Sequence, residues 1–177
     1  MPPLARRFLT TDDEFARFRG VALVAIDGVD FEPYLRLLLS QHDGVCIAEH
    51  VVVLTDKDPT APGDRVARFT ELAAELGAQT RLSVQAADIT LEAALFSAGN
   101  EACLHDGFLA QRPQSEQAWN DMMLTPEPER PAALIQLLQD KRISKGDLAQ
   151  YVAGVVESDA AFAIPPYLQA AITAATA

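Results

Sequence analysis

Blocks of apolar residues with the length of strands or helices follow one another along the first half of the chain. Three apolar or alternating runs predict strands, at 21–26, 51–54 and 81–86. The run 51–54 has four apolar β-formers in a row, which is typical of a parallel strand buried on both faces. The run 81–86 alternates, as an edge strand does.

Helices are predicted between these strands. Apolar residues at helical spacing predict one helix over 32–41. A second begins at the N-cap Asp64 and runs to about residue 76, where Gly77 ends it as a C-cap. Because right-handed crossovers make such strands parallel neighbours, the order strand, helix, strand, helix, strand predicts an α/β fold with a Rossmann-type parallel sheet flanked by helices.

After residue 87 the pattern becomes helical. Helices are predicted at about 90–98, 100–112, from 115 onward, 131–141, 145–157 and 165–174. The proline-rich stretch 125–131 predicts a bend within one domain, because the part that follows is too small to fold alone. We therefore expect a single domain over 1–177, with an α/β core over about 1–90 and a helical part over about 91–177.

Composition narrows the class of protein. With 177 residues, 49% of them hydrophobic, the chain is expected to form one soluble globule. No apolar run reaches the roughly 18 residues of a membrane span and residues 1–7 have no apolar h-region, so a cytoplasmic protein without membrane contact is expected. The net charge of −11 argues against a basic surface that binds nucleic acid, so any such contact would need a bridging metal.

Two carboxylates follow the predicted strand 51–54 directly. Asp56 and Asp58 lie two residues apart, so on an extended backbone they point to the same side, and Pro59 ends the strand. The carboxyl end of a parallel strand is where open α/β sheets place their active sites. Two close carboxylates suggest a divalent cation such as Mg²⁺, although the same residue types also occur in ordinary loops.

Three further groups are candidates by position. Glu92 begins the helix after the third predicted strand, where a carboxylate also stabilises the first helical turn. Lys145 precedes a glycine at a helix start and is equally consistent with an exposed loop lysine. The stretch 27–31 ends the first predicted strand and contributes either a carboxylate or a turn. The two cysteines, Cys46 and Cys103, are expected to be free thiols.

Several motifs together resemble a known family. In sequence order they are Val24–Leu35, Val53–Asp58, Thr90–Glu92, Lys145–Ala149 and Pro165–Leu168. Their order and spacing resemble the carboxyl-terminal TOPRIM region of the overcoming-lysogenization-defect (OLD) family nucleases. The resemblance covers nearly the whole chain and implies a TOPRIM-like fold.

The resemblance also implies a function. Family members are Mg²⁺- or Mn²⁺-dependent DNA endonucleases or nickases, with an ABC-type ATPase domain ahead of this region. By this resemblance Asp56 and Asp58 are metal ligands, Glu92 serves a second metal, and Lys145 is the catalytic lysine. DNA would be bound through the metals, since two cations about 3.5–4 Å apart clamp a phosphodiester.

The chain departs from the family pattern in two respects. The first TOPRIM motif, an apolar strand that ends in Glu-Gly, is not found, and residues 2–7 resemble the helix that follows it. No Walker A sequence occurs, so an ATPase would have to be a separate domain or partner chain. We expect weak metal binding and little or no DNA cleavage by this chain alone; homodimer formation is left open.

Two other functions fit the sequence. Residues 56–60 also satisfy the DxDxT pattern of haloacid-dehalogenase phosphatases, with Asp56 as nucleophile and Asp58 as general acid. That motif normally lies near the amino end, and no later Asp-Asp pair supports it. A non-catalytic interaction module suits an acidic chain with an incomplete site.

Overall fold

The computed structural model describes residues 1–26, 30–57 and 64–177. It forms two compact units, and each is built from two separate stretches of chain. The sheet unit consists of Thr11–Asp88 and Pro166–Ala177, and the helical unit consists of Met1–Thr10 and Ile89–Pro165. Whether the two units act as one domain stays a prediction. No helix in the described ranges is long and apolar enough to span a membrane.

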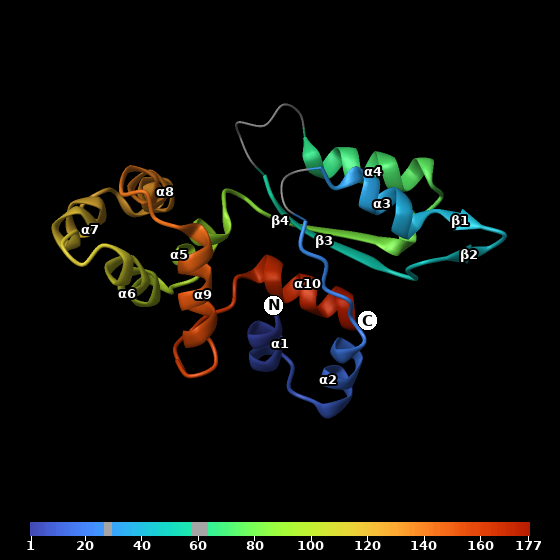
Figure 1. The fold of residues 1–177 in the computed structure, drawn as a ribbon, viewed down its shortest axis with the longest axis horizontal. Coiled ribbons are helices and arrows are strands. Elements are labelled where there is room, and N and C mark those ends of the chain that lie inside the picture. The colour runs from blue at the N-terminus through green and yellow to red at the C-terminus, as the bar shows by residue number, and fades with distance from the viewer. Residues whose placement is uncertain (27–29, 58–63) are drawn as a thin grey trace. The chain divides into compact units, whose positions relative to one another are not determined.

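A pair of parallel strands forms the centre of the sheet unit (Figure 1). Strands β3 (Val51–Asp56) and β4 (Leu82–Ala87) pair from Val51 opposite Leu82 to Asp56 opposite Ala87. Helix α4 (Arg65–Glu75) connects them. The side chain of Asp64 caps α4 by accepting hydrogen bonds from the backbone N–H groups of residues 66 and 67, at 2.9 and 3.1 Å. Both strands and this cap were predicted from the sequence.

Helices cover both faces of the parallel pair. Helices α3 (Glu32–Leu39) and α4 lie on one face, and α10 (Pro166–Thr176) packs on β3 and β4 from the other, as Figure 1 shows. Helix α2 (Asp12–Arg19) packs against α10. The core between the helices and strands is formed by Leu35, Leu39, Val53, Phe69, Leu72 and Ala78. Apolar burial of this kind is the main stabilising term of the unit.

The predicted first strand is wrong. Residues 21–26 form no strand, and Leu23 and Val24 are 51% and 60% exposed. In the described part of the chain, β3 and β4 pair only with each other, and the apolar run joins neither of them. A β-forming sequence becomes a strand only where a partner provides hydrogen bonds and packing. The adjacent residues Asp27, Gly28 and Val29 lie outside the described residues.

A short hairpin was missed in the sequence. The predicted helix ends at Leu39, and β1 (Gln41–His42) and β2 (Val45–Cys46) then pair antiparallel. Asp43 and Gly44 between them have positive φ, 51° and 78°. Asp-Gly with two positive φ angles is typical of the tight turn that suits the twist of a hairpin.

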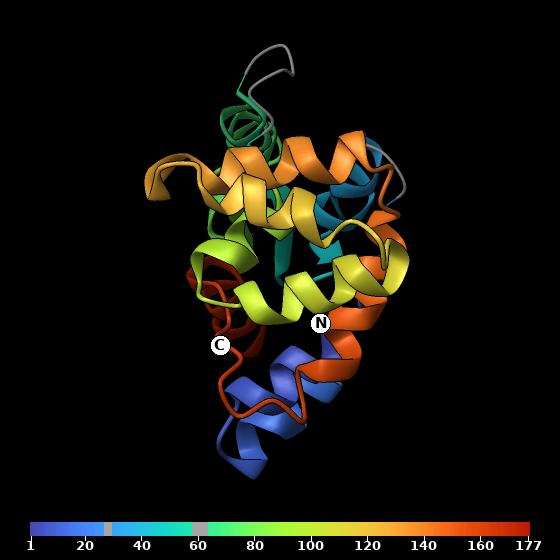
Figure 2. The ribbon, with the colours of Figure 1, turned by 90° about the vertical axis from the view of Figure 1, so that its left-hand side faces the viewer.

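The helical unit, seen from one side in Figure 2, contains the helices predicted after residue 87 except the last, which is α10 of the sheet unit. They are α5 (Leu91–Ser97), α6 (Glu101–Gln111), α7 (Glu116–Met123), α8 (Arg130–Asp140) and α9 (Lys145–Val155). Short 3-10 helices lie at Glu127–Glu129 in this unit and at Gln79–Arg81 in the sheet unit. The proline-rich bend is thus partly helical.

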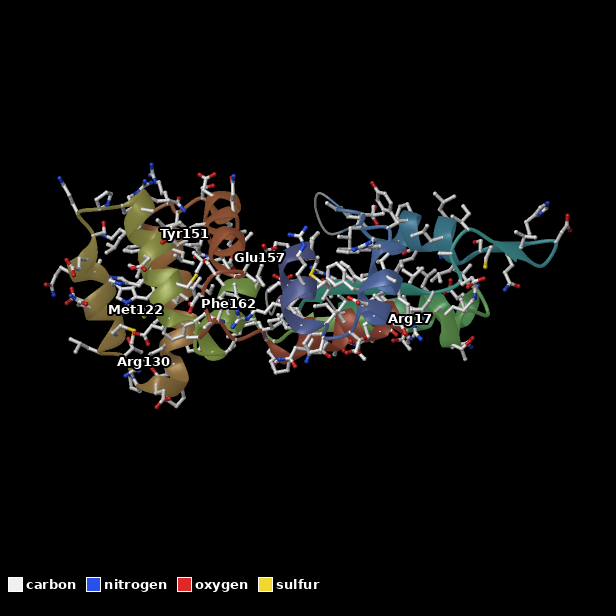
Figure 3. All side chains as sticks on the ribbon, turned by 90° about the horizontal axis from the view of Figure 1, so that it is seen from below. Arg17, Met122, Arg130, Tyr151, Glu157 and Phe162 are labelled. Atoms are coloured by element: carbon white, nitrogen blue, oxygen red, sulfur yellow. The ribbon has the colours of Figure 1, made fainter. Side chains whose placement is uncertain are left out.

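The first ten residues belong to this unit because α1 (Pro2–Phe8) is bound to the segment after α9. Arg6 forms an ion pair with Glu157 at 2.7 Å, and the Arg7 guanidinium lies 6.0 Å from the ring centre of Phe162. Figure 3 labels Glu157 and Phe162 in this region. The helix expected at residues 2–7 is therefore present.

Aromatic rings fill the core of the helical unit. Trp119 of α7 is buried, and its ring centre lies 5.6 Å from that of Phe108 and 6.4 Å from that of Phe96. Tilted pairs at these distances contribute about 0.5–1.5 kcal/mol each beyond burial. They fix α7 against α5 and α6.

Asn100 connects the turn between α5 and α6 to a distant loop. Its side-chain amide donates to the carbonyls of Leu95 and Ala163, at 2.9 and 2.7 Å, and its carbonyl accepts from the N–H of Ala163 at 2.8 Å. The sequence predicted Asn100 as a helix cap. It occupies the N-cap position, but its side chain makes no capping bond and serves the loop instead.

Close packing of α6 on α9 depends on Gly107. A methyl group at this position would lie 2.7 Å from Leu148 Cδ1 and 3.0 Å from Tyr151 Cδ1. Leu148 is only 1% exposed, so it has no free space into which to move. The glycine therefore sets the distance between the two helices.

We expect Gly107→Ala to destabilise the protein by about 1–2 kcal/mol, measured by urea denaturation. Overpacking of a buried helix contact costs about 1–3 kcal/mol, and alanine's better helix propensity returns only about 0.5–1 kcal/mol. Gly154→Ala in α9 is the matched control, because nothing lies within 4 Å of a methyl group there. A control that loses as much stability as Gly107→Ala would contradict the packing argument.

Candidate functional site

Asp56 is the last residue of β3, as the sequence predicted. Its neighbour Lys57 continues the ladder by donating its N–H to the carbonyl of Ala87 at 2.8 Å. Arg65 of α4 donates to the Thr55 hydroxyl at 3.1 Å and to the Asp56 carbonyl at 3.3 Å. These contacts fix the backbone at the carboxyl end of β3, where Asp56 is half-buried.

Asp88 lies at the same edge and was not identified from the sequence. It follows β4, and its carboxylate forms an ion pair with Lys57 at 2.8 Å. The hydrogen bond to Asp88 raises the pKa of the Lys57 ammonium. The rule that located Asp56 would have located Asp88 too, because both residues end neighbouring parallel strands. Asp58 lies outside the described residues, so its relation to Asp56 stays a prediction.

Glu92 lies in the first turn of α5 in the helical unit. The side chain of the N-cap Thr90 accepts a hydrogen bond from the Ala93 N–H at 3.4 Å. The helix begins at Leu91, one residue before Glu92. The Glu92 side chain is only 11% exposed. A carboxylate this buried needs a cationic or hydrogen-bonding partner.

Lys145 provides that partner. It is the first residue of α9, whose N-cap Ser144 accepts a hydrogen bond from the Asp147 N–H at 3.2 Å. The Lys145 ammonium lies 3.4 Å from Glu92 Oε2, and its side chain is 55% exposed. The structure thus brings together two predicted site residues that are 53 positions apart in the chain.

The end of α6 holds the segment that precedes Lys145. Gln111 donates to the carbonyl of Ser144 at 3.2 Å and accepts from its N–H at 2.9 Å. Arg112 donates to the carbonyls of Lys141 and Arg142, at 2.9 and 3.0 Å. Gln111 and Arg112 were not identified from the sequence, since nothing in their local pattern indicates a distant partner.

Comparison with known proteins gives one informative match. No family model and no curated protein matches the chain. Among solved structures, the C-terminal region of the Burkholderia pseudomallei OLD protein is similar, with a TM-score of 0.58 and 25% sequence identity. The match covers 97% of this chain and 91% of that one. The chain has the fold of an OLD C-terminal domain. The family resemblance and the TOPRIM-like α/β fold predicted from the motifs are confirmed.

The metal ligands predicted for this OLD-type domain remain untested. The described residues contain no group of three or more His, Cys, Asp or Glu side chains placed to hold a metal ion. Asp56 belongs to the sheet unit and Glu92 to the helical unit, and Asp58 is not among the residues described. A metal site formed by these three carboxylates is therefore taken up below as a proposal.

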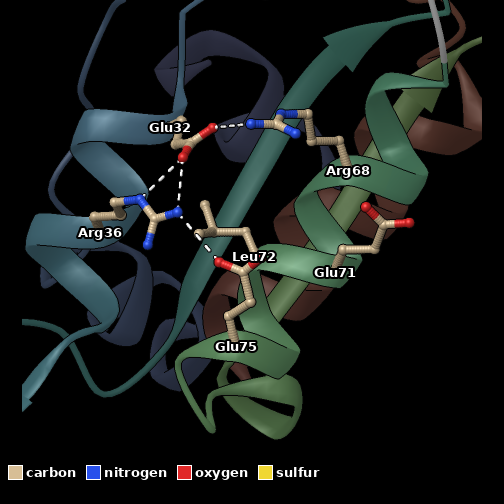
Figure 4. A pocket seen from close by; sticks show the side chains of 6 residues that line it. All are labelled: Glu32, Arg36, Arg68, Glu71, Leu72 and Glu75. Atoms are coloured by element: carbon tan, nitrogen blue, oxygen red, sulfur yellow. Dashed lines mark hydrogen bonds and ion pairs between the residues drawn. The ribbon is translucent and has the colours of Figure 1, made fainter.

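A shallow charged pocket on the OLD-type domain lies between α3 and α4 (Figure 4). Glu32 accepts from Arg68 at 2.7 Å and forms an ion pair with Arg36 at 2.8 Å, and Arg36 also reaches Glu75 at 3.2 Å. The hydrogen bonds from Arg36 and then Arg68 lower the pKa of Glu32. This network fastens two helices, and Glu71, which also lines the pocket, takes no part in it.

We expect Lys145→Met to destabilise the domain by about 1 kcal/mol, measured by urea denaturation, because it leaves the buried Glu92 carboxylate without its cation. The cost stays modest because solvent screens the half-exposed lysine. Adding Glu92→Gln should restore part of the loss, since the unpaired charge is then removed.

Lys57→Met is the matched control for this pair. Lys57 is 57% exposed, much like Lys145, but its partner Asp88 is 88% exposed. We expect no measurable loss of stability, because water replaces the lost contact. An equal loss in the two lysine variants would show that burial of the anion does not matter.

The Glu32 network should appear in the pH dependence of stability. Its pKa is lowered in the folded state, so its contribution is present above the ordinary value of 4.5 and is lost as the pH falls toward the lowered value. We expect Glu32→Gln to flatten the stability curve between about pH 5 and 3. Glu71→Gln, in the same pocket, should leave the slope of the wild type unchanged when both are measured by urea denaturation.

Proposed function

We propose that the chain is an OLD-type nuclease domain that hydrolyses DNA phosphodiester bonds with the help of Mg²⁺ or Mn²⁺. The observation that carries the proposal is the contact between Lys145 and Glu92 at 3.4 Å, inside a fold similar to an OLD C-terminal region over 97% of the chain. Two residues selected from separate motifs thus meet in space. In an unrelated fold, these two residues would not be expected to be in contact.

The donor set suits hard divalent cations. Asp56, Asp58 and Glu92 offer carboxylate oxygens, which are the ligands that Mg²⁺ and Mn²⁺ prefer. Bound cations would supply Lewis-acid stabilisation of the phosphate and a more acidic water. Glu92 is also suited by its position, because the contact with Lys145 at 3.4 Å holds its buried carboxylate in place.

Lys145 is proposed to stabilise charge on the scissile phosphate. Its ammonium is held at the start of α9, with half of the side chain exposed, so a phosphate oxygen can take the place of the Glu92 oxygen as its anionic partner. Charge-assisted hydrogen bonds of this type stabilise the phosphorane-like oxygens that develop during cleavage. Asp56, fixed by the contacts of Arg65 with its backbone, would hold its position at the sheet edge.

Because no Glu-Gly motif is found, we expect weak metal binding and slow nicking. With a dissociation constant near 1 mM, 10 mM Mn²⁺ should stabilise the wild type by about 1.4 kcal/mol, seen as a higher melting temperature. Asp56→Asn and Glu92→Gln should lose most of this gain and all Mn²⁺-dependent nicking of supercoiled plasmid. Asp43→Asn, in the exposed hairpin turn, is the carboxylate control and should behave as the wild type does.

Three outcomes would contradict the proposal. If neither Mn²⁺ nor Mg²⁺ changes the melting temperature and no nicking is found, the chain is a non-catalytic module. If a generic phosphate monoester is turned over rapidly and this activity is lost in Asp56→Asn, the chain is a phosphatase. Nicking that survives in both carboxylate variants would indicate a different catalytic site.

A further inference from the structure

Nearly all cations of this acidic chain are engaged within the protein. The chain has 14 lysines and arginines, and all lie in the described ranges. Five form ion pairs, namely Arg6, Arg36, Lys57, Arg68 and Lys145. Seven donate to backbone or hydroxyl oxygens or lie over aromatic rings, namely Arg7, Arg17, Arg19, Arg65, Arg81, Arg112 and Arg130.

Lys141 and Arg142 are the two that remain. Within the described residues, neither side chain has a hydrogen bond, an ion pair or a ring contact. They are adjacent in the turn between α8 and α9, four and three residues before Lys145. The cations without a contact among the described residues therefore lie close in sequence to the proposed catalytic lysine.

Neither side chain is needed to finish α8. Basic residues often stabilise the last carbonyls of a helix, but here Arg112 donates to the carbonyls of both Lys141 and Arg142. The N–H groups of Arg142 and Ile143 close the helix end by donating to Gln139 and Leu138, each at 2.9 Å. The side chains of Lys141 and Arg142 thus have no structural task that the fold reveals.

The backbone of Arg142 is in a conformation that favours glycine. Its φ is 51°, in the left-handed region, and glycine is the usual residue at this position of a helix end. An arginine here is less stable than a glycine would be. A non-glycine residue in such a strained conformation motivates the hypothesis that its side chain has a function.

The turn itself carries only positive charge. The segment 141–145 contains three cations and no acid. The acids nearest to it are Asp140, which accepts from Gln136 at 2.8 Å, the exposed Asp147, and Glu92, which is paired with Lys145. Four residues span at most about 14 Å, so all three cations can contact one stretch of nucleic-acid backbone.

We propose that the turn 141–145 binds the phosphodiester backbone of DNA and guides it to Lys145. This inference rests on the proposed nuclease function and adds the surface by which the helical unit holds its substrate. It also revises the expectation that this chain contacts DNA through metal alone. The positive charge of the turn supplies part of the contact directly.

Binding without cleavage tests this surface. A fluorescein-labelled DNA duplex is titrated with protein in EDTA, and anisotropy is followed from about 50 to 200 mM salt. In the double variant Lys141→Gln/Arg142→Gln we expect roughly tenfold weaker binding, with the slope of log affinity against log salt reduced by about 2. Arg6→Gln/Arg19→Gln removes the same charge from two exposed helix positions and should match the wild type.

Arg142→Gly is the decisive single variant, because stability and binding should move in opposite directions. We expect a higher melting temperature, since glycine suits the positive φ, together with weaker DNA binding. Unchanged binding in Arg142→Gly, or equal losses in the test and control double variants, would overturn the proposal. So would a wild type that does not bind DNA in EDTA at the lowest salt.

The result of this DNA-binding test can be distinguished from the result of the nuclease test. Binding that depends on Lys141 and Arg142 without any Mn²⁺-dependent nicking would support this surface and count against the catalytic proposal. Nicking that is insensitive to both residues, with unchanged affinity, would support the catalytic proposal and overturn this surface.

Discussion

The hydrogen bonds from the end of α6 to the turn between α8 and α9 set the position of Lys145. Gln111 binds both backbone groups of Ser144, and Arg112 donates to the carbonyls of Lys141 and Arg142. Through this clamp the first residue of α9 is held where its ammonium meets the buried Glu92 carboxylate. The contact that carries the functional argument and the conformation of the basic turn both depend on it.

The contacts of individual cations describe the electrostatics of this protein better than its net charge does. A net charge of −11 would ordinarily argue against a nucleic-acid ligand. Twelve of the cations make contacts that stabilise helices, strand ends and loops, so their side chains are held by the protein. What matters for an anionic ligand is the charge left unengaged, and Lys141 and Arg142 supply it at one place.

Local rules predicted much of the fold and part of the site. The strand that ends at Asp56, the cap at Asp64 and the helices after residue 87 follow from short-range patterns and are present. The run 21–26 has an equally strong β pattern and is not a strand, because pairing needs a partner that sequence periodicity does not reveal. The contact of Lys145 with Glu92 likewise could not be predicted from local sequence patterns, because it depends on the packing of helices far apart in the chain.

The chain crosses between the two units more than once, and this limits how the protein can be truncated. The polypeptide passes from one unit to the other at three points, after Thr10, after Asp88 and after Pro165. No single cut therefore yields either unit whole, because each needs two stretches of sequence that the other unit interrupts. Truncation at residue 88 would remove α10 from the sheet and leave α1 without the segment after α9 to which it is bound. The order of the chain thereby links the integrity of one unit to that of the other.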